Sequence, residues 1–463
     1  MTTQTPERSG PLASSFRDPS GYLIHIDGRL CRLVKAVYAA HYDRLMESGL
    51  YAELSDSGLL VRHEEIALPS GLGEDAYKLL RPELVPFISY PYEWCFSQYR
   101  DAALLTLDIA ERAIAADMVL KDASAYNVQF IGNRPVFIDT LSFEQYDATK
   151  PWIAYGQFCR HFLAPLLLMS HDDARLNKLM RSFIDGVPLD LASKLLPGST
   201  RFSPGILLHI HQHAASELKQ VNAREPSSAP TRAFGKNAML GLLDSLKGLI
   251  KKLSPPGGKT EWGDYYSDTN YTEAGFEAKK QLVKEFLAEV KPGVAWDLGA
   301  NTGVMSQIAV EAGNYVVAFD IDANAVERNY ARPKQSTLIP LIQDFSNPSA
   351  SIGWANAERP GLMQRGPADT LLALAVIHHL AIGNNVPLPQ IADWFADLGK
   401  NLIIEFVPKH DSQVKRLLLH REDIFTTYDQ ANFEEVMTKR WKMIRKASIS
   451  ETERTLYLFE RKS

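Results

Sequence analysis

The chain has few cysteines, no excess of positive charge and no long apolar run. Its three cysteines, Cys31, Cys95 and Cys159, lie far apart, which excludes a disulfide framework and a dense cysteine zinc site. The net charge of -5 gives no global basic field for nucleic acid. No apolar run approaches the roughly 18 residues that span a bilayer, and residues 1–20 lack a signal-peptide pattern. We expect a soluble, cytoplasmic protein without a transmembrane segment or a nucleic-acid partner.

With 463 residues, of which 45% are hydrophobic, the chain can form more than one core. A stretch rich in Pro and Ser, followed by a basic amphipathic helix and then Pro-Pro-Gly-Gly, marks a boundary at residues 223–260. Such a helix could lie on a membrane or a partner, but we interpret it as packed on one of the protein's own domains. The predicted organisation is a disordered tail at 1–20, an N-terminal domain at 21–222, this linker, and a C-terminal domain at 261–463.

After residue 260, short β-rich apolar runs alternate with stretches that can be helical. The predicted strands are 294–298, 315–319, 337–342, 370–377 and 401–406, and the helices include 276–290. This alternation indicates a parallel sheet covered on both faces. Runs at 441–449 and 456–459 predict an antiparallel pair at its edge. The N-terminal half is mixed, with helices at 30–53 and 102–116 and short strands at 127–131 and 136–138.

Three successive predicted strands each end in an acid. Asp297 ends the first, before a tight loop that contains Gly299 and Gly303. Asp320, at the end of the second, follows Asp297 by 23 residues, close to the roughly 20-residue offset at which an acid meets ribose hydroxyls. Asp344 ends the third beside an aromatic ring, which suits an adenine. Ligands of open α/β sheets bind at these strand ends, so a nucleotide-type site is predicted.

The loop after Asp297 discriminates between cofactors. A dinucleotide fold uses G-x-G-x-x-G to receive a pyrophosphate, but here Asp297 would repel phosphate and suits a cationic ligand. On these residues the C-terminal half resembles a class I S-adenosylmethionine-dependent methyltransferase, with a nicotinamide dehydrogenase as the runner-up. The resemblance implies a seven-stranded Rossmann-like domain with S-adenosyl-L-methionine as cofactor. The cofactor-binding residues that it implies are Asp297, Gly299, Asn301, Gly303, Asp320, Asp344, Tyr266 and Tyr271.

The fourth strand leads to His378 and His379, at the edge that borders the methyl group in this fold. An imidazole can accept a proton near neutral pH, as a hydroxyl or amine nucleophile requires, so either histidine is a candidate base; both could instead only shape the pocket. The strand lacks an Asn/Asp-Pro-Pro-Tyr signature, which argues against base-amine methylation of the kind that this motif marks. Glu405, at the end of the fifth strand, is a candidate for the substrate side. No metal site is predicted.

One stretch of the N-terminal half resembles the C-lobe of kinase-like folds. Asp122 and Asn127 keep the spacing of a kinase catalytic loop, and Asp139 follows an apolar strand where a second metal acid would stand. The His-Arg of that loop is replaced, Asp139 is not followed by Phe-Gly, and no Gly-rich loop precedes it. We therefore predict an α+β, kinase-like scaffold that binds or positions the acceptor.

The whole chain from about residue 20 resembles a bacterial two-part family in which some members are nodulation proteins. Its motifs here are residues 155–165, the pair His378–His379 and residues 405–409. The resemblance implies an enzyme, an S-adenosylmethionine-dependent methyltransferase acting on a small-molecule or carbohydrate-type hydroxyl. Two alternatives stay open, a non-catalytic scaffold that binds S-adenosylmethionine and phosphotransfer by the N-terminal half. The acceptor and the oligomeric state are not determined by the sequence.

Overall fold

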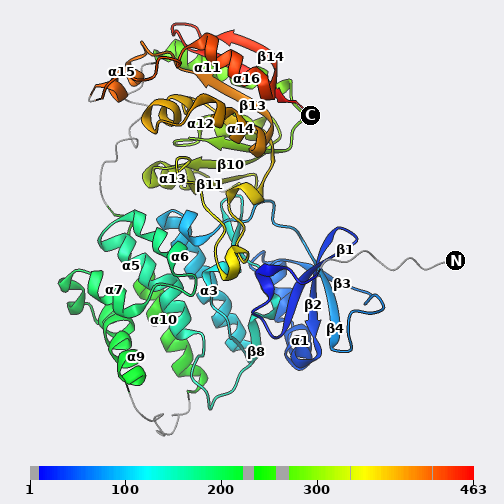
Figure 1. Ribbon diagram of the computed structural model, residues 1–463. Helices are drawn as coiled ribbons and strands as arrows, with labels where there is room; N and C mark the ends of the chain where they lie inside the picture. Colours follow the sequence, from blue (N-terminus) through cyan, green and yellow to red (C-terminus); the bar gives the residue numbers. More distant parts are fainter. Residues whose placement is uncertain (1–9, 223–233, 257–270, 334, 420, 463) are drawn as a thin grey trace, which may run out of the picture. The chain divides into compact units, whose positions relative to one another are not determined.

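The chain folds into two compact units (Figure 1). The computed structural model describes residues 10–222, 234–256, 271–333, 335–419 and 421–462. Unit 1 includes the residues up to 130, residues 135–256 and residues 351–359, and unit 2 includes residues 131–134, 257–350 and 360–463. The short segments 131–134 and 351–359 therefore belong to a different unit from their neighbours in sequence, an exchange that the predicted domain ranges do not contain.

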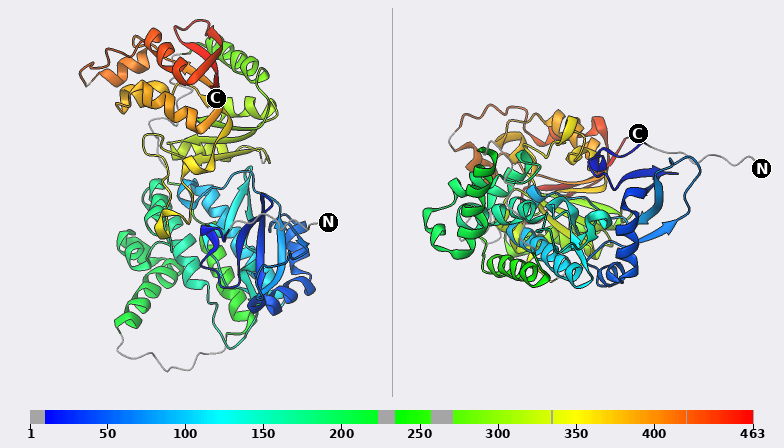
Figure 2. Two further views of the ribbon diagram at one scale, coloured as in Figure 1. Left: turned by 45° about the vertical axis from the view of Figure 1, so that its right-hand side comes forward. Right: turned by 90° about the horizontal axis from the view of Figure 1, so that it is seen from below.

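Unit 1 combines small sheets with many helices. Its strands are β1 (Gly21–Ile26), β2 (Arg29–Lys35), β3 (His63–Ile66), β4 (Ala76–Pro82), β5 (Met118–Leu120), β6 (Val128–Ile131), β7 (Arg134–Phe137) and β8 (Phe143–Gln145). Its α-helices are α1 (Ala39–Glu47), α2 (Leu50–Asp56), α3 (Phe96–Ala115), α4 (Tyr155–Phe158), α5 (Ala164–His171), α6 (Leu179–Ser182), α7 (Leu189–Leu195), α8 (Pro204–Ile206), α9 (His213–Asn222) and α10 (Lys236–Lys251). Strands β1, β2, β4 and β3 form one antiparallel sheet, drawn in blue in Figure 2.

The helix predicted at 30–53 is wrong in its first part. Residues 29–35 form β2, which pairs with β1 and β4, and the helices α1 and α2 follow it. Cys31 and Leu33 are buried and point to the same face, where they pack with Ile24 and Leu79. This two-residue period is that of a strand. The segment is extended because it pairs with β1 on one side and with β4 on the other.

The predicted disordered tail at 1–20 is too long, because residues 10–20 are ordered in unit 1. The backbone N–H of Leu12 donates to the carbonyl of Leu23 at 2.8 Å. Arg17 forms an ion pair of 2.7 Å with Glu358, and Asp18 forms one of the same length with Arg32. The partner of Arg17 lies more than three hundred residues away in sequence, so local sequence could not indicate this anchor.

The amphipathic helix of the linker is α10, and its apolar side packs within unit 1. Met239, Leu243, Leu246 and Ile250 are buried, and Lys247 pairs with Glu111 of α3. The interpretation of this helix as packed on its own domain is confirmed. Within the described ranges, no helix has both the length and the apolar composition to cross a membrane.

Unit 2 contains one seven-stranded sheet. Its strands are β9 (Val294–Leu298), β10 (Tyr315–Asp320), β11 (Leu338–Ile342), β12 (Ala368–Ala373), β13 (Gly399–Phe406), β14 (Trp441–Ser448) and β15 (Thr455–Arg461). Their order is β11-β10-β9-β12-β13-β15-β14. The first five strands of that order are parallel, and β15 and β14 run antiparallel at one edge (Figure 2). The predicted α/β class, with a parallel sheet and an antiparallel pair at its edge, is confirmed.

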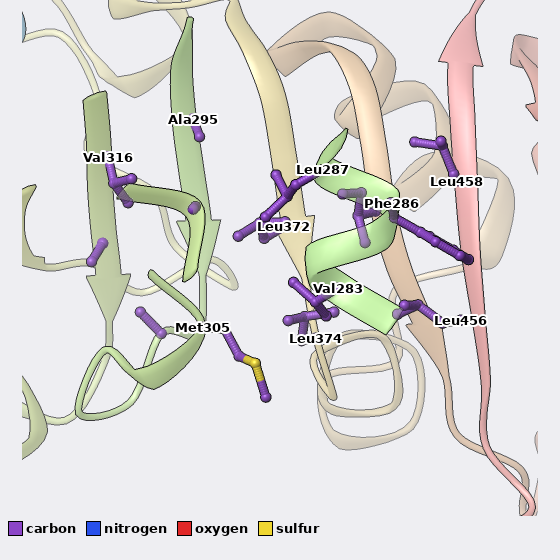
Figure 3. Packing of buried hydrophobic residues seen from close by; sticks show 14 of the residues in the cluster. Val283, Phe286, Leu287, Ala295, Met305, Val316, Leu372, Leu374, Leu456 and Leu458 are labelled. Carbon is purple, nitrogen blue, oxygen red and sulfur yellow. The ribbon is translucent and has the colours of Figure 1, made fainter. Parts of the chain in front are cut away.

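Helices cover both faces of this sheet, which is why its strands are nearly continuous apolar runs. The helices are α11 (Glu273–Ala288), α12 (Val304–Glu311), α13 (Ala323–Tyr330), α14 (Leu388–Leu398), α15 (Ser412–Leu418) and α16 (Gln430–Arg440). Helix α11 directs Val283, Phe286 and Leu287 toward Leu372 and Leu458 of the sheet (Figure 3). Phe433 of α16 instead packs its ring against aromatic rings of β13 and β15.

Replacing Leu246 of α10 with alanine tests how strongly this helix is bound to unit 1. Leu246 is fully buried, so Leu246→Ala should lower the free energy of unfolding by about 2–5 kcal/mol through lost burial and a cavity. The matched control is Leu240→Ala on the same helix, where the side chain is exposed and the change should stay within about 0.5 kcal/mol. Urea unfolding measures both, and equal effects would contradict the packing.

Candidate functional site

A cavity of about 290 Å³ lies at the carboxyl ends of the parallel strands of unit 2. Its wall comes from the residues that end β9, β10 and β11, from the segment after β12 and from α11. This is the edge at which open α/β sheets bind ligands. The strand order places the ends of β11, β10, β9 and β12 side by side, so the cavity follows that edge.

The loop between β9 and α12 brings bare backbone to the cavity. Gly299 has a φ of 79°, and a Cβ added there would come within 2.6 Å of the Val376 side chain. Asn301 also has a positive φ, 49°. Gly303, with a φ of 81°, immediately precedes α12 and does not line the cavity. A Cβ added to Gly303 would come within 2.4 Å of the Asn329 side chain. The structure thus requires both glycines for backbone geometry, while Gly299 and Asn301 contribute directly to the wall.

Asp297 lines the cavity from the end of β9 and is only 1% exposed. The Ser306 hydroxyl donates a hydrogen bond of 2.6 Å to its carboxylate. Burial, together with the charge of nearby Asp320, raises the pKa of Asp297 to about 6 despite that hydrogen bond. A buried carboxylate with one polar partner binds a cation favourably, because a cation replaces the solvation that the fold removed.

Asp320 lines the cavity from the end of β10. The backbone N–H groups of Asn301 and Asp322 donate to its two oxygens at 2.7 and 2.8 Å. Burial raises the pKa of Asp320 to about 6. Each carboxylate oxygen keeps a further lone pair, so this side chain can still accept hydrogen bonds from a ligand. Ile321, next to it in the wall, is 52% exposed and offers an apolar surface.

Asp344 follows β11 at the far end of the cavity from β12. Its carboxylate accepts hydrogen bonds from the backbone N–H and the hydroxyl of Ser346, at 2.8 and 2.6 Å. The ring of Phe345 lines the cavity beside it. An acid next to an aromatic face is the combination that the sequence predicted here for an adenine.

The segment after β12 forms the wall opposite to Asp344. The strand predicted to run to residue 377 ends at Ala373, and Ala375 has a φ of 57°, which turns the chain into the cavity wall. His379 lines the cavity, whereas His378 is 1% exposed and lies behind it, with ring centroids 4.2 Å apart. Burial, with the charge of Arg454, lowers the pKa of His379 to about 4. Burial also lowers the pKa of His378 well below its usual range.

The remaining predicted residues of unit 2 divide into three cases. Tyr271 lines the cavity, and Tyr266 lies outside the described residues. Glu405 is 0% exposed and does not line the cavity, but forms an ion pair of 2.5 Å with Lys279. The sequence analysis missed Lys279, a cavity-lining residue of α11. A signal exists: Lys279 stands between Phe276 and Val283 in the apolar stripe of that helix.

The three polar residues predicted in unit 1 lie close together. The Asn127 amide and the charge of Asp139 both act on Asp122, whose pKa is raised chiefly by burial. Asp122 also accepts a hydrogen bond of 2.8 Å from Gln157. Asp139 forms an ion pair of 2.9 Å with Arg32 of β2. No group of three or more His, Cys, Asp or Glu residues is arranged to hold a metal ion in the part of the chain that the structure describes. Whether this unit is kinase-like stays a prediction.

The strand order, the glycine-containing loop and the acids at three strand ends together identify the fold class of unit 2. Unit 2 is a Rossmann-like α/β domain with an antiparallel edge pair, the fold implied by the resemblance to class I methyltransferases. No family model matches the chain. The chain is 37% identical over 465 residues to the nodulation protein NoeA of Rhizobium meliloti (strain 1021), covering 98% of this chain and 97% of that protein. It belongs to the family of the nodulation protein NoeA.

Three solved structures resemble part of this chain. The N-methyltransferase NodS of Bradyrhizobium japonicum WM9 is 10% identical, with 41% of this chain and 98% of that chain covered and a TM-score of 0.30. Magnesium protoporphyrin IX methyltransferase of Synechocystis PCC 6803 is 18% identical, with 43% and 93% covered and a TM-score of 0.31. WbdD is 15% identical, with 44% and 43% covered and a TM-score of 0.30.

The raised pKa of Asp297 predicts a pH-dependent cost to folding. Because the pKa is about 6 in the folded chain and about 4 in the unfolded chain, the protonated form favours folding. This contribution is present below about pH 4 and is lost as the pH rises through about 6. Asp297→Asn should therefore be more stable than the wild type by roughly 2–3 kcal/mol at about pH 8, with little difference at about pH 4.

Urea unfolding at both pH values measures this effect. The matched control is Asp397→Asn, because Asp397 is exposed and faces Arg440 at 3.7 Å; its effect should be small at either pH. A constant difference between Asp297→Asn and the wild type across the pH range would contradict the raised pKa.

Proposed function

We propose that this chain is an S-adenosylmethionine-dependent methyltransferase that methylates an oxygen atom of a small-molecule or carbohydrate-type acceptor. The observation that carries the proposal is the row of carboxylates from Asp344 through Asp320 to Asp297, along one cavity at the ends of neighbouring strands. A cofactor with an adenine, a ribose and a cationic amino-acid end, and without phosphate, complements such a row. A pyrophosphate would be repelled by it.

The residues present fit this cofactor. Gly299 leaves a cradle that a Cβ would fill, since that atom would meet Val376 at 2.6 Å. Asp344 and the ring of Phe345 would hold the adenine, Asp320 the ribose hydroxyls, and Asp297 with Gly299 and Asn301 the methionine moiety. When bound, S-adenosylmethionine supplies an electrophilic methyl group on a positively charged sulfur.

His379 is the residue that we assign to the proton of the acceptor. Since its pKa is about 4, the imidazole is neutral at neutral pH, the form that accepts a proton. His379 lines the cavity, and His378 lies behind it. We therefore propose that His378 packs against the His379 ring and holds it in place. The acceptor hydroxyl would approach from this end, where apolar Leu380 and the amide of Asn384 complete the wall.

Phosphotransfer by unit 1 is not the function that its contacts favour. The carboxylate of Asp139 is neutralised by Arg32 at 2.9 Å, and Arg32 also holds Asp18 at 2.7 Å. Asp122 is bound by Gln157. Arg32 thus supplies the positive charge beside Asp139 that a phosphate-bound cation would have to supply. We therefore assign recognition of the acceptor to unit 1, as the sequence predicted.

Binding of S-adenosylhomocysteine, measured by isothermal titration calorimetry, tests the cofactor assignment. The wild type should bind, and Asp320→Ala should bind at least about tenfold more weakly, because hydrogen bonds to a charged acceptor are lost. Asp393→Ala is the matched control, since Asp393 is an exposed partner of Arg440. No binding to the wild type, or undiminished binding to Asp320→Ala, would overturn the proposal.

Substituting His379 tests the assigned base. His379→Gln should lower kcat by roughly 100-fold to 10,000-fold, because a positioned base contributes about that much, while S-adenosylhomocysteine still binds. The control is His410→Gln, an exposed histidine whose loss should leave kcat unchanged. Turnover is followed with methyl-labelled S-adenosylmethionine and cell extracts as the source of acceptor. Cofactor binding without turnover on any acceptor would favour the non-catalytic scaffold instead.

A further inference from the structure

A cluster of buried charges lies against one end of the cavity. Glu405, at the end of β13, is 0% exposed and receives three partners. The Lys279 ammonium lies 2.5 Å from one carboxylate oxygen, Arg454 donates to the other at 3.1 Å, and the Tyr271 hydroxyl donates to the same oxygen as Arg454. Arg454 is held in turn by Asp411 at 2.8 Å. Burial would raise the pKa of Glu405, but the charges of Lys279 and Arg454 outweigh it and lower that pKa to about 2.

Only two members of this cluster reach the cavity. Tyr271 and Lys279 line it, while Glu405, Arg454 and Asp411 do not. Among the described residues that line the cavity, Lys279 is the one lysine or arginine, beside three carboxylates. A buried ammonium requires a counter-charge, and Glu405 provides it from behind the wall.

The position of Lys279 along the sheet edge identifies what it faces. The strand order runs from β11 through β10, β9 and β12 to β13. Asp344 follows β11 and Asp320 ends β10. Lys279 instead forms an ion pair with Glu405 of β13, and its charge also acts on Asp297. Lys279 is therefore at the end opposite to Asp344, next to the acid assigned to the cationic group. A neighbouring ammonium and carboxylate complement a zwitterion.

We propose that Glu405 and Arg454 are positioning residues that hold Lys279 as the recognition site for the carboxylate of an α-amino-acid group. This inference rests on the proposed function, and it adds that the cavity selects cofactors with an intact amino-acid end over those that lack one. A lysine ammonium has three N–H donors, so Lys279 can keep Glu405 and still donate to a ligand. Arg454 and Tyr271 continue to satisfy Glu405 when Lys279 is shared.

Binding of two ligands tests the amino-acid site independently of the adenosine site. S-Adenosylhomocysteine carries the amino-acid group, and 5′-methylthioadenosine keeps the adenosine and lacks that group. Lys279→Met should bind S-adenosylhomocysteine about 10-fold to 100-fold more weakly, the effect of a lost charged hydrogen bond, and should bind 5′-methylthioadenosine as the wild type does. Lys279→Arg keeps the charge and should restore much of the affinity. Lys284→Met, at an exposed lysine of the same helix, is the control.

The double variant Lys279→Met/Glu405→Gln distinguishes recognition from simple neutralisation of Glu405. If Lys279 only neutralised Glu405, the double variant would regain wild-type affinity for S-adenosylhomocysteine. We expect it to remain as weak as Lys279→Met. Glu405→Gln alone should weaken S-adenosylhomocysteine and spare 5′-methylthioadenosine, which a general loss of structure would not do; thermal unfolding of each variant is recorded in parallel.

The remaining outcomes distinguish failure of this inference from failure of the proposed function. Equal weakening of both ligands by Lys279→Met, or recovery in the double variant, overturns the inference and leaves the proposed function in place. Wild-type protein that binds neither ligand overturns the proposed function, and the inference with it.

Discussion

The burial of carboxylates at the carboxyl edge of a parallel sheet is the constraint on which the rest of unit 2 depends. Asp297 and Asp320 are almost without solvent exposure, and their pKa values are both raised to about 6. A fold optimised for stability alone would place neutral residues there. In the function that we propose, the same desolvation strengthens the attraction of these carboxylates for a cationic ligand. The loop around Gly299 and the turn after β12 contribute to the wall of the same cavity.

Glu405 shows the opposite solution to the same problem. It is as deeply buried as Asp297, yet its pKa is lowered to about 2 because Lys279 and Arg454 compensate its charge. One acid is left with a single polar partner and faces the cavity, and the other is fully paired and stays behind the wall. In the function that we propose, the first contacts the ligand directly, and the second acts through the lysine that it holds.

Two short segments belong to a different unit from their neighbours in sequence. Residues 351–359 leave unit 2 between β11 and β12 and belong to unit 1, where Glu358 pairs with Arg17 and the Arg359 guanidinium lies 4.7 Å from the centroid of the Tyr126 ring. Residues 131–134, at the turn between β6 and β7, belong to unit 2, where Asn133 bonds Gln335. The 37% identity to NoeA covers 98% of this chain and 97% of that protein, and so extends over both units.

The sequence by itself determined the α/β class of unit 2, the start of most of its strands and the acids that end three of them, because apolar periodicity and strand-end residues are local properties. It could not determine that the strand predicted to reach residue 377 ends at Ala373, or that residues 29–35 pair as a strand, since pairing partners decide both. Lys279 became a site residue only in the tertiary structure. A helix brings it to a glutamate more than one hundred residues away, and no local pattern records the charge that a distant strand supplies.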